Sequence, residues 1–163
     1  MVQASTTLWH INGDFLSLKP TGVARYGHEV AQQLDSLVAD GHPLTRNVRF
    51  EVISPVQPPA GFFRSIPVRV VPPLPVHIPQ FWVQVQLPWV AADRLLSFGN
   101  LGPVAAKRQI LCVHDLHSIT MPESFSRGFR YAHSLLTPVL GKRARLMTVS
   151  EFSKAEIVRL GFS

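Results

Sequence analysis

The chain has 163 residues, of which 46% are hydrophobic and 16% are charged, and its formal net charge is +6. This length and composition are typical of one globular domain with a buried core, and they exclude an intrinsically disordered chain. No apolar run approaches the roughly 18 residues that a membrane-spanning helix needs. The N-terminal sequence lacks the basic start and apolar core of a signal peptide.

The single cysteine, Cys112, cannot form a disulfide within the chain and lies inside an apolar run. We therefore expect a reducing, cytoplasmic setting and a small buried side chain rather than a nucleophile. Residues 101–163 carry 9 of the 16 basic side chains but only 4 of the 10 acidic ones. Such a basic excess attracts phosphate groups, nucleic acid or anionic lipid alike. The sequence has no nucleic-acid recognition motif, so nucleic acid is not expected as a partner.

The first elements in chain order are a strand, a loop with a glycine and a helix. Residues 7–12 predict the strand, and the loop that follows holds Asp14. Thr21 is the candidate N-cap of the helix, and Gly41 is its candidate C-terminal stop. The apolar positions of this helix recur with helical spacing at Val23, Tyr26, Val30, Leu34 and Leu37. This order is one that brings a backbone close to a phosphate or a sugar.

The middle of the chain is rich in proline, with 9 of its 14 prolines between Pro55 and Pro88. Residues 49–53 and 68–71 predict a second and a third strand. The proline-rich stretch also carries aromatic and aliphatic residues, which favours irregular structure packed on the domain over a linker. Residues 80–92 fit both helical spacing and strand alternation.

The last third contains two short apolar runs, each followed by polar residues and then a helical pattern. His114 and Asp115 follow the strand predicted at 110–113, while Ser150 and Glu151 follow the one at 146–149. A helix is expected to open at Pro122, with Phe125 and Phe129 on its apolar side. It is expected to turn Arg127, Arg130 and His133 away from that side and to end at Gly141. For the last helix we expect a capping box from Ser153 to Glu156, a cap role for Ser150 and a stop at Gly161.

Repeated strand and helix patterns of this kind are typical of βαβ units, so the sequence predicts an α/β fold with a mostly parallel, Rossmann-like sheet. In such sheets the ligand crevice lies outside the carboxyl ends of the strands. The polar residues after each apolar run are therefore expected at the edge where these folds do chemistry.

Four stretches in order resemble the N-terminal, acceptor-side domain of GT-B glycosyltransferases of the retaining family 4, or group 1, type. They are TGVARYGHEVAQQL at 21–34, VHDL at 113–116, PESFSRGFR at 122–130 and VSEFSKAEIVRLG at 149–161. The resemblance covers nearly the whole chain, as one domain over 1–163. It implies a helix broken near Pro88, before a strand at 95–98.

The resemblance implies a hexosyltransferase activity. A sugar would pass from a nucleotide sugar to a polysaccharide, lipopolysaccharide or glycolipid acceptor with its anomeric configuration retained and without a metal or cofactor. In the family, a second Rossmann-like lobe binds the donor nucleotide and supplies the key catalytic residues. Nothing in 1–163 corresponds to that lobe, so we expect the chain to be inactive alone and to need the missing lobe or a second subunit.

The candidate catalytic residues are His114 and Asp115. By itself, a histidine after a strand is as consistent with a structural hydrogen bond as with a site, and it titrates near neutral pH. The family's active-site histidine matches His114, which is expected to contact the reacting sugar or acceptor. Asp115 is expected to orient His114 or to bind an acceptor hydroxyl; the simpler interpretation is a turn aspartate bonded to its own backbone.

The candidate substrate-binding residues are Gly22, Arg25, Asn100 and Ser150. Gly22 stands at a helix N-terminus, which attracts anions, and the matching family loop approaches the donor diphosphate. Arg25 lies one turn later and is equally consistent with a solvated arginine. Asn100 lies in a turn-rich loop after the strand expected at 95–98.

Two other functions remain open. His114, Asp115 and His117 could supply ligands of a metal-dependent hydrolase, although no further ligands are evident. Alternatively, the chain is a non-catalytic module that binds glycan or phosphate. The basic residues Arg127, Arg130, Lys142, Arg143 and Arg145 most simply complement helix ends, but they also suit peripheral contact with an anionic membrane.

Overall fold

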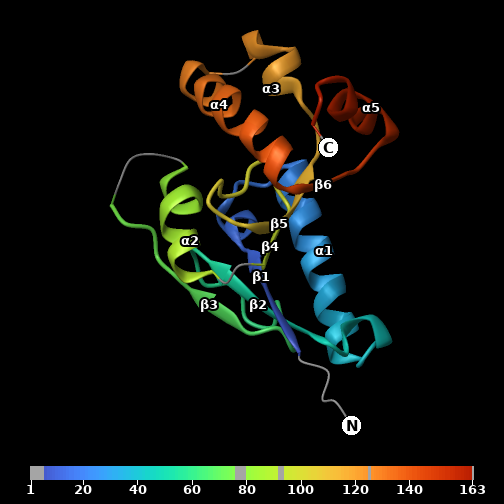
Figure 1. Cartoon of the computed structure of the whole chain (residues 1–163). Coiled ribbons are helices and arrows are strands. Elements are labelled where there is room, and N and C mark those ends of the chain that lie inside the picture. Colours follow the sequence, from blue (N-terminus) through green and yellow to red (C-terminus); the bar gives the residue numbers. More distant parts are fainter. Residues whose placement is uncertain (1–5, 76–79, 92–93, 125, 163) are drawn as a thin grey trace.

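A computed structural model describes residues 6–75, 80–91, 94–124 and 126–162. Six strands form one sheet in which every neighbouring pair is parallel, in the order β3-β2-β1-β4-β5-β6 (Figure 1). The strands are β1 (Thr7–Asn12), β2 (Val48–Ser54), β3 (Val68–Val70), β4 (Arg94–Ser97), β5 (Arg108–Val113) and β6 (Arg145–Thr148). The predicted α/β fold with a Rossmann-like sheet is confirmed.

The strand order reverses at β1. The chain first moves outward from β1 to β2 and β3, and then returns to place β4, β5 and β6 on the other side of β1. Asn12, at the end of β1, therefore pairs with Ile53 of β2 and with Ser97 of β4. In doubly wound sheets this reversal opens a crevice outside the carboxyl ends of the two central strands.

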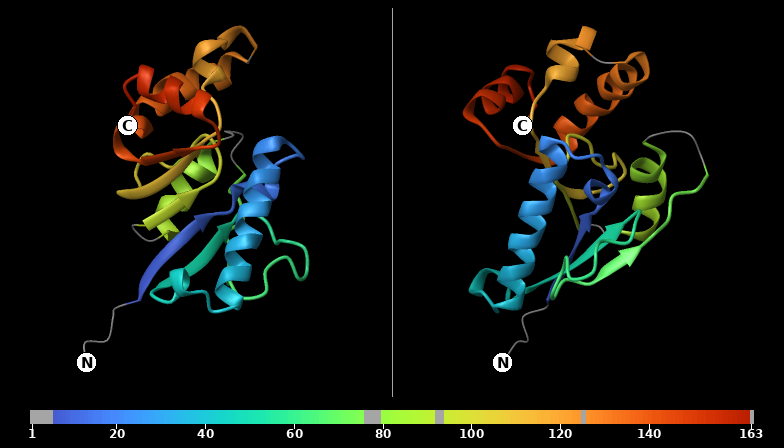
Figure 2. Two further views of the ribbon diagram at one scale, coloured as in Figure 1. Left: turned by 90° about the vertical axis from the view of Figure 1, so that its right-hand side faces the viewer. Right: turned by 180° about the vertical axis from the view of Figure 1, so that it is seen from behind.

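Both faces of the sheet are covered. Ile11 and Val52 are fully buried on the face that carries α1 (Gly22–Ala39). Ile53 and Leu95 are fully buried on the opposite face, beneath the segment that ends in α2 (Leu87–Val90). Farther along that face, Leu111 packs with residues of α4 (Arg127–Arg143) and α5 (Glu151–Arg159). Burial on both faces explains apolar runs such as residues 110–113 of β5. Figure 2 shows α1 against the sheet from two sides.

The first helix has the predicted ends. The Thr21 hydroxyl accepts the Ala24 N–H at 3.2 Å, and Gly41 ends the helix with φ of 64°. Its buried carboxylate, Asp35, accepts the N–H groups of Arg64, Ser65 and Ile66 at 2.7–2.9 Å. The proline-rich stretch is thus packed on the domain as expected, and Asp35 hydrogen-bonds it to α1.

Residues 81–90 are helical, as the resemblance implied, but the helix is not broken at Pro88. Its turn η3 (Trp82–Gln86) is π-helical, and the Leu87 N–H bonds to the Trp82 carbonyl five residues back. Proline lacks an N–H, and its ring crowds the carbonyl four residues earlier, here that of Gln84. A wider turn relieves that conflict, so Pro88 is accommodated inside the helix.

The helix expected from Pro122 begins later. Pro122–Ser124 form a separate 3-10 turn, η4, after the short helix α3 (His117–Thr120). Phe125 lies outside the described residues. α4 begins at Arg127 and continues through Gly141 to Arg143, so the expectation that Gly141 ends it is wrong. A Cβ at Gly141 would lie 2.6 Å from the Phe162 ring, and this close contact is why glycine occupies the position.

His133 was expected on the outer side of α4, but only 4% of its surface is exposed. Its Nδ1 lies 3.0 Å from the Ser118 hydroxyl of α3. Burial lowers the pKa of His133, and the nearby charge of Asp115 opposes that effect. The residue therefore links α4 to α3 instead of facing solvent.

The last helix begins one turn before the predicted capping box. Ser150 is the N-cap of α5, and its hydroxyl accepts the Ser153 N–H at 3.1 Å, so the expected cap role of Ser150 is confirmed. Ser153 lies inside the helix and is not a cap. Gly161, with φ of 72°, follows the helix end as predicted. No helix in the described part of the chain has both the length and the apolarity to cross a bilayer.

Candidate functional site

The ends of β1 and β4 approach α1 closely. Gly13 follows β1, donates its N–H to the Ile53 carbonyl at 2.8 Å, and would place a Cβ only 2.7 Å from that oxygen. Gly99, after β4, lies so near the first turn of α1 that a Cβ there would be 3.7 Å from a Val23 methyl. Glycine is thus required at 13, where β1 ends against β2, whereas at 99 a side chain would only touch the helix start.

His114 follows β5 and is half-buried at this edge. Its Nε2 lies 2.8 Å from the Phe98 carbonyl oxygen, and its ring meets that of Tyr26 from α1 edge-on at a centroid distance of 4.8 Å. A carbonyl only accepts, so Nε2 carries the proton in this bond. In the neutral ring, Nδ1 is therefore the atom with a free lone pair. Two elements thus fix the orientation of the imidazole.

The backbone of His114 is held by Asn100 and by Ser153, and Ser150 in turn contacts Ser153. The Asn100 side-chain oxygen accepts the His114 N–H at 2.7 Å. The Ser153 hydroxyl donates to the His114 carbonyl at 2.7 Å, and the Ser150 hydroxyl lies 3.1 Å from that of Ser153. The structure therefore brings His114, Asn100 and Ser150 into one hydrogen-bonded group, in which Asn100 positions His114.

Asp115 does not orient His114. Its Oδ1 accepts the His117 N–H at 3.0 Å, which is the turn geometry of an aspartate bonded to the backbone two residues on. The same oxygen lies 3.6 Å from His117 Nδ1. The ring of His114 takes its orientation from the Phe98 carbonyl instead, because Asp115 is committed to the turn that leads into α3.

Gly22 and Arg25 lie in the first turns of α1, and both are exposed. Thr21 binds the N–H groups of Ala24 and Arg25, which leaves those of Gly22 and Val23 without a partner among the described hydrogen bonds. A Cβ on Gly22 would meet no atom within 4 Å, so packing does not require glycine there. The helix start is open and offers two N–H groups and a partial positive charge to an anion.

Asp14 is the first of two functional candidates whose roles the sequence reasoning did not identify. It follows Gly13 and opens the 3-10 turn η1 (Asp14–Ser17). Burial raises the pKa of its carboxyl to about 7, against smaller opposing effects of the Phe15 N–H and the Asn12 amide. The Asn12 Oδ1 accepts the Asp14 backbone N–H at 3.2 Å, and the Asn12 Nδ2 is buried without a partner among the described residues. A carboxyl that titrates near neutral pH can take up or release a proton in a reaction.

Tyr26 is the second group that the sequence did not single out, because its helical spacing marks it only as an apolar position. It stands between His114 and Phe98, with ring centroids 4.8 and 6.4 Å away. Burial raises the pKa of its hydroxyl to about 12, and the adjacent Cys112 side chain adds to the effect. Cys112 is itself buried, as expected. Tyr26 therefore stays neutral and forms a wall beside the imidazole.

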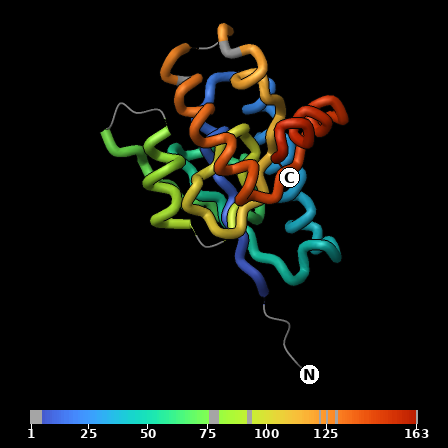
Figure 3. The backbone as a smooth tube through the Cα atoms, turned by 45° about the horizontal axis from the view of Figure 1, so that its top comes forward, coloured from blue at the N-terminus to red at the C-terminus, as the bar shows by residue number. Residues whose placement is uncertain are grey.

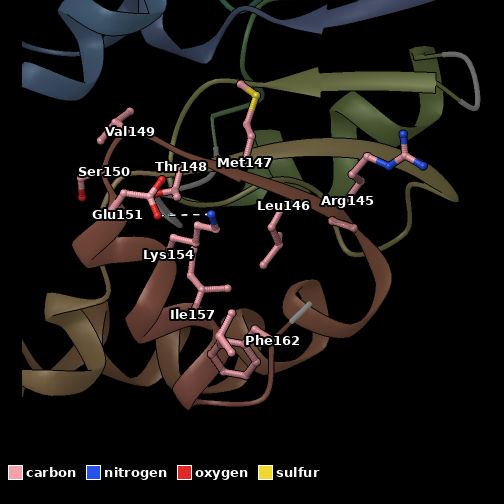
Figure 4. Close-up of a pocket in the computed structure, with 12 residues that line it drawn as sticks. Arg145, Leu146, Met147, Thr148, Val149, Ser150, Glu151, Lys154, Ile157 and Phe162 are labelled. Atoms are coloured by element: carbon pink, nitrogen blue, oxygen red, sulfur yellow. Dashed lines mark hydrogen bonds and ion pairs between the residues drawn. The ribbon is translucent and has the colours of Figure 1, made fainter.

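Two cavities lie away from the candidate site, and neither is lined by His114 or Asp14. One, of about 790 Å³, runs between β6 and α5, with the Lys154–Glu151 ion pair at its side (Figure 4). The other, of about 710 Å³, lies against α3 and α4 and is lined by Arg127 and Arg130. In the described part of the chain, no group of three or more His, Cys, Asp or Glu residues could hold a metal ion. His114, Asp115 and His117 therefore do not converge as a ligand set.

Comparisons of the chain with protein-family models, with curated proteins and with solved structures gave no match.

Proposed function

We propose that this chain is the acceptor-side lobe of a retaining GT-B glycosyltransferase. The complete enzyme transfers a hexose from a nucleotide sugar to a polysaccharide, lipopolysaccharide or glycolipid acceptor. The donor nucleotide and most of the catalytic groups belong to a second Rossmann-like lobe, supplied in the same polypeptide or by a second subunit. The proposal starts from the resemblance of residues 21–34 and 113–161, and the fold is consistent with it.

The observation that carries the proposal is the setting of His114. The imidazole stands at the carboxyl end of β5, with Nε2 bound to the Phe98 carbonyl and Tyr26 against its ring. A ring held in this way offers Nδ1 to a sugar hydroxyl in a fixed direction. Fixed hydrogen-bonding groups favour a transition state because they need no reorganisation during the reaction. His114 thus binds and orients the reacting sugar or acceptor.

The neighbouring groups have roles that fit the same substrate. The free N–H groups at the start of α1, beside Gly22, suit a diphosphate, and exposed Arg25 adds positive charge one turn later. Asp14, with a pKa raised to about 7, suits an acceptor hydroxyl. Its carboxylate accepts the hydroxyl proton in a hydrogen bond and makes the oxygen a better nucleophile.

The test has a binding arm and a turnover arm. In the binding arm, amide chemical shifts are recorded while octyl glucoside, as a monomeric acceptor analogue, is added to the chain. We expect shifts around His114 and the start of α1, and we expect His114→Ala to abolish them. His117→Ala, which changes an exposed histidine three residues away, is the matched control and keeps them. Shifts that survive His114→Ala would contradict the proposed site.

In the turnover arm, UDP-glucose and GDP-mannose are incubated with the chain and octyl glucoside, and nucleotide release is measured. We expect no release above buffer from the chain alone and release once a polypeptide carrying the second lobe is added. Rapid turnover by the chain alone would refute the two-lobe proposal. The absence of turnover with any second lobe would favour a non-catalytic binding module.

A further inference from the structure

The outer face of α4 is apolar at its centre and carries charges of only one sign. Tyr131, Leu135 and Val139 recur every four residues along it and are 69%, 53% and 40% exposed. Residues at this spacing line one side of a helix, so they form a continuous stripe. Figure 3 shows α4 lying on the outside of the fold. A helix of this position and length normally buries its apolar stripe, and this one packs a second stripe, through Leu136 and Leu140, against the core.

The charged residues of α4 frame this stripe. Arg127 begins the helix and Lys142 and Arg143 end it, whereas no Asp or Glu occurs from 127 to 143. Glu123, in η4, is the nearest acidic residue before the helix. Within the described residues, the side chains of Arg127, Arg130 and Lys142 have no hydrogen bond or ion pair, and Arg143 bonds only the Val104 carbonyl. No described acidic side chain neutralises these charges.

A cavity of about 710 Å³ adjoins one side of the stripe. Arg127 and Arg130 line it together with Tyr131, and none of its described lining residues is acidic. Guanidinium groups are donors that suit phosphate oxygens. The same side of α4 therefore offers an apolar surface and, next to it, a recess for anionic groups.

We propose that the outer face of α4 docks on an anionic lipid bilayer. The helix lies in the plane of the interface, with Tyr131, Leu135 and Val139 among the acyl chains. Arg127, Lys142 and Arg143 contact lipid phosphates at the two ends of the stripe, and Arg130 does so from the cavity. An apolar stripe flanked by basic side chains is the pattern of helices that lie on membranes without crossing them.

The composition of the face favours lipid over a protein partner. Protein interfaces are depleted of lysine and usually alternate charges of both signs, because pairing of specific charges sets their register. Here all the charges of α4 are positive, and the apolar stripe includes Tyr131, a type of side chain that is enriched where lipid head groups meet acyl chains. α4 also lies on the same half of the molecule as the strand ends that hold His114 (Figure 2). The inference does not depend on the proposed function.

The test is co-sedimentation of the whole chain with vesicles. Vesicles of phosphatidylcholine mixed with phosphatidylglycerol are expected to bind it, and vesicles of phosphatidylcholine alone are not. Lys142→Glu is expected to weaken binding by about fivefold or more, since each basic residue near an anionic surface contributes roughly that factor. Leu135→Asp is expected to weaken it by about tenfold, because it places a charge among the acyl chains.

The matched controls are Leu44→Asp and Arg49→Glu. Leu44 is 79% exposed and Arg49 is exposed, and both lie outside α4. Each control makes the same chemical change and is expected to leave vesicle binding intact. Thermal unfolding, followed by circular dichroism, is used to check that all four variants are folded.

Three outcomes would overturn the proposal. Equal binding to both vesicle types would show that the charges do not matter. Displacement by inorganic phosphate, but not by chloride of equal ionic strength, would assign the cavity to soluble phosphate esters. No binding to anionic vesicles by the folded wild-type chain would leave the face to a protein partner.

Discussion

The two long helices, α1 and α4, are seated by the same device but differ in their polar anchors. Each approaches a phenylalanine ring through a glycine: a Cβ at Gly27 would lie 2.7 Å from the Phe15 ring, and one at Gly141 would lie 2.6 Å from that of Phe162. The anchor of α1 is the buried carboxylate of Asp35, whereas that of α4 is the neutral pair of His133 and Ser118.

This difference extends to the outer surfaces. α1 mixes acidic and basic residues and uses its first turns at the candidate site. α4 is purely basic and leaves Tyr131 and Leu135 in solvent. α1 therefore packs on the core and contributes its first turns to the candidate site. α4 packs on the core along one side only, and its other side exposes apolar residues to solvent.

The largest expected effect tests the anchor of α1. Replacement of Asp35 by alanine removes the acceptor of three backbone N–H groups, of which that of Ile66 is buried. We expect the free energy of unfolding to fall by roughly 3 kcal/mol, since hydrogen bonds to a charged group contribute about 1.5–3 kcal/mol each and are not additive. Urea denaturation measures the change.

Asp40→Ala is the control for this prediction. Asp40 is exposed, and its ion pair with Arg64 is weak because the paired nitrogen and oxygen lie 4.0 Å apart. Its effect should stay within about 0.5 kcal/mol. Burial alone would raise the pKa of Asp35, but the N–H groups of Arg64, Ile66 and Ser65 lower it below its ordinary value. The stability from Asp35 is therefore fully present above the unfolded pKa and is lost as the pH falls through the folded one. An Asp35→Ala variant that still lost this stability in acid would contradict the assignment.

The second prediction tests the device that the helices share. Gly27→Ala and Gly141→Ala should each reduce the free energy of unfolding by about 1–3 kcal/mol, because the added methyl overlaps a ring packed in the core. Gly128→Ala is the control on α4: its Cβ would meet open space, so the change should be neutral or stabilising by up to about 1 kcal/mol. If Gly141→Ala were also neutral, Phe162 would not be fixed against α4.

The smallest expected effect concerns Asp14, at the end of β1. Its folded pKa, about 7, lies above the ordinary value of 3.8, so the folded state binds more protons between these values. Wild-type stability should therefore fall as the pH rises through this range. Asp14→Asn removes the titration and should gain about 1–2 kcal/mol over wild type between pH 5 and pH 8. If the difference in free energy of unfolding between the two proteins did not vary with pH, burial would not raise the pKa of Asp14.

The sequence predicted five of the six strands within a few residues, as short apolar runs between polar residues, and the resemblance supplied the strand at 95–98. It also placed Thr21, Gly41 and Gly161 correctly, since caps depend on local chemistry. His133 was misplaced because helical spacing alone does not show that α3 covers part of α4. The start of α5 was misplaced because both Ser150 and Ser153 have cap chemistry, and only the end of β6 decides between them.

The candidate site was predicted less completely. His114, Asn100 and Ser150 were named from their positions after strands, but their mutual hydrogen bonds depend on how β4, β5 and α5 pack. Asp14 gave no signal beyond following Asn12 and Gly13, since its titration depends on burial by distant residues. The π-helical turn at Pro88 was not foreseen, because the rule that proline breaks a helix does not say how the backbone adapts.

The all-parallel sheet determines how the chain can fold. No two neighbouring strands are joined by a hairpin, and the central strand β1 has partners that begin at Val48 and at Arg94. During synthesis, both edges of β1 can therefore be covered only after β4 (Arg94–Ser97) has been made. The long connections between these strands are closed before the contacts that stabilise them exist, which slows folding and leaves a bare strand edge exposed to other chains in the meantime.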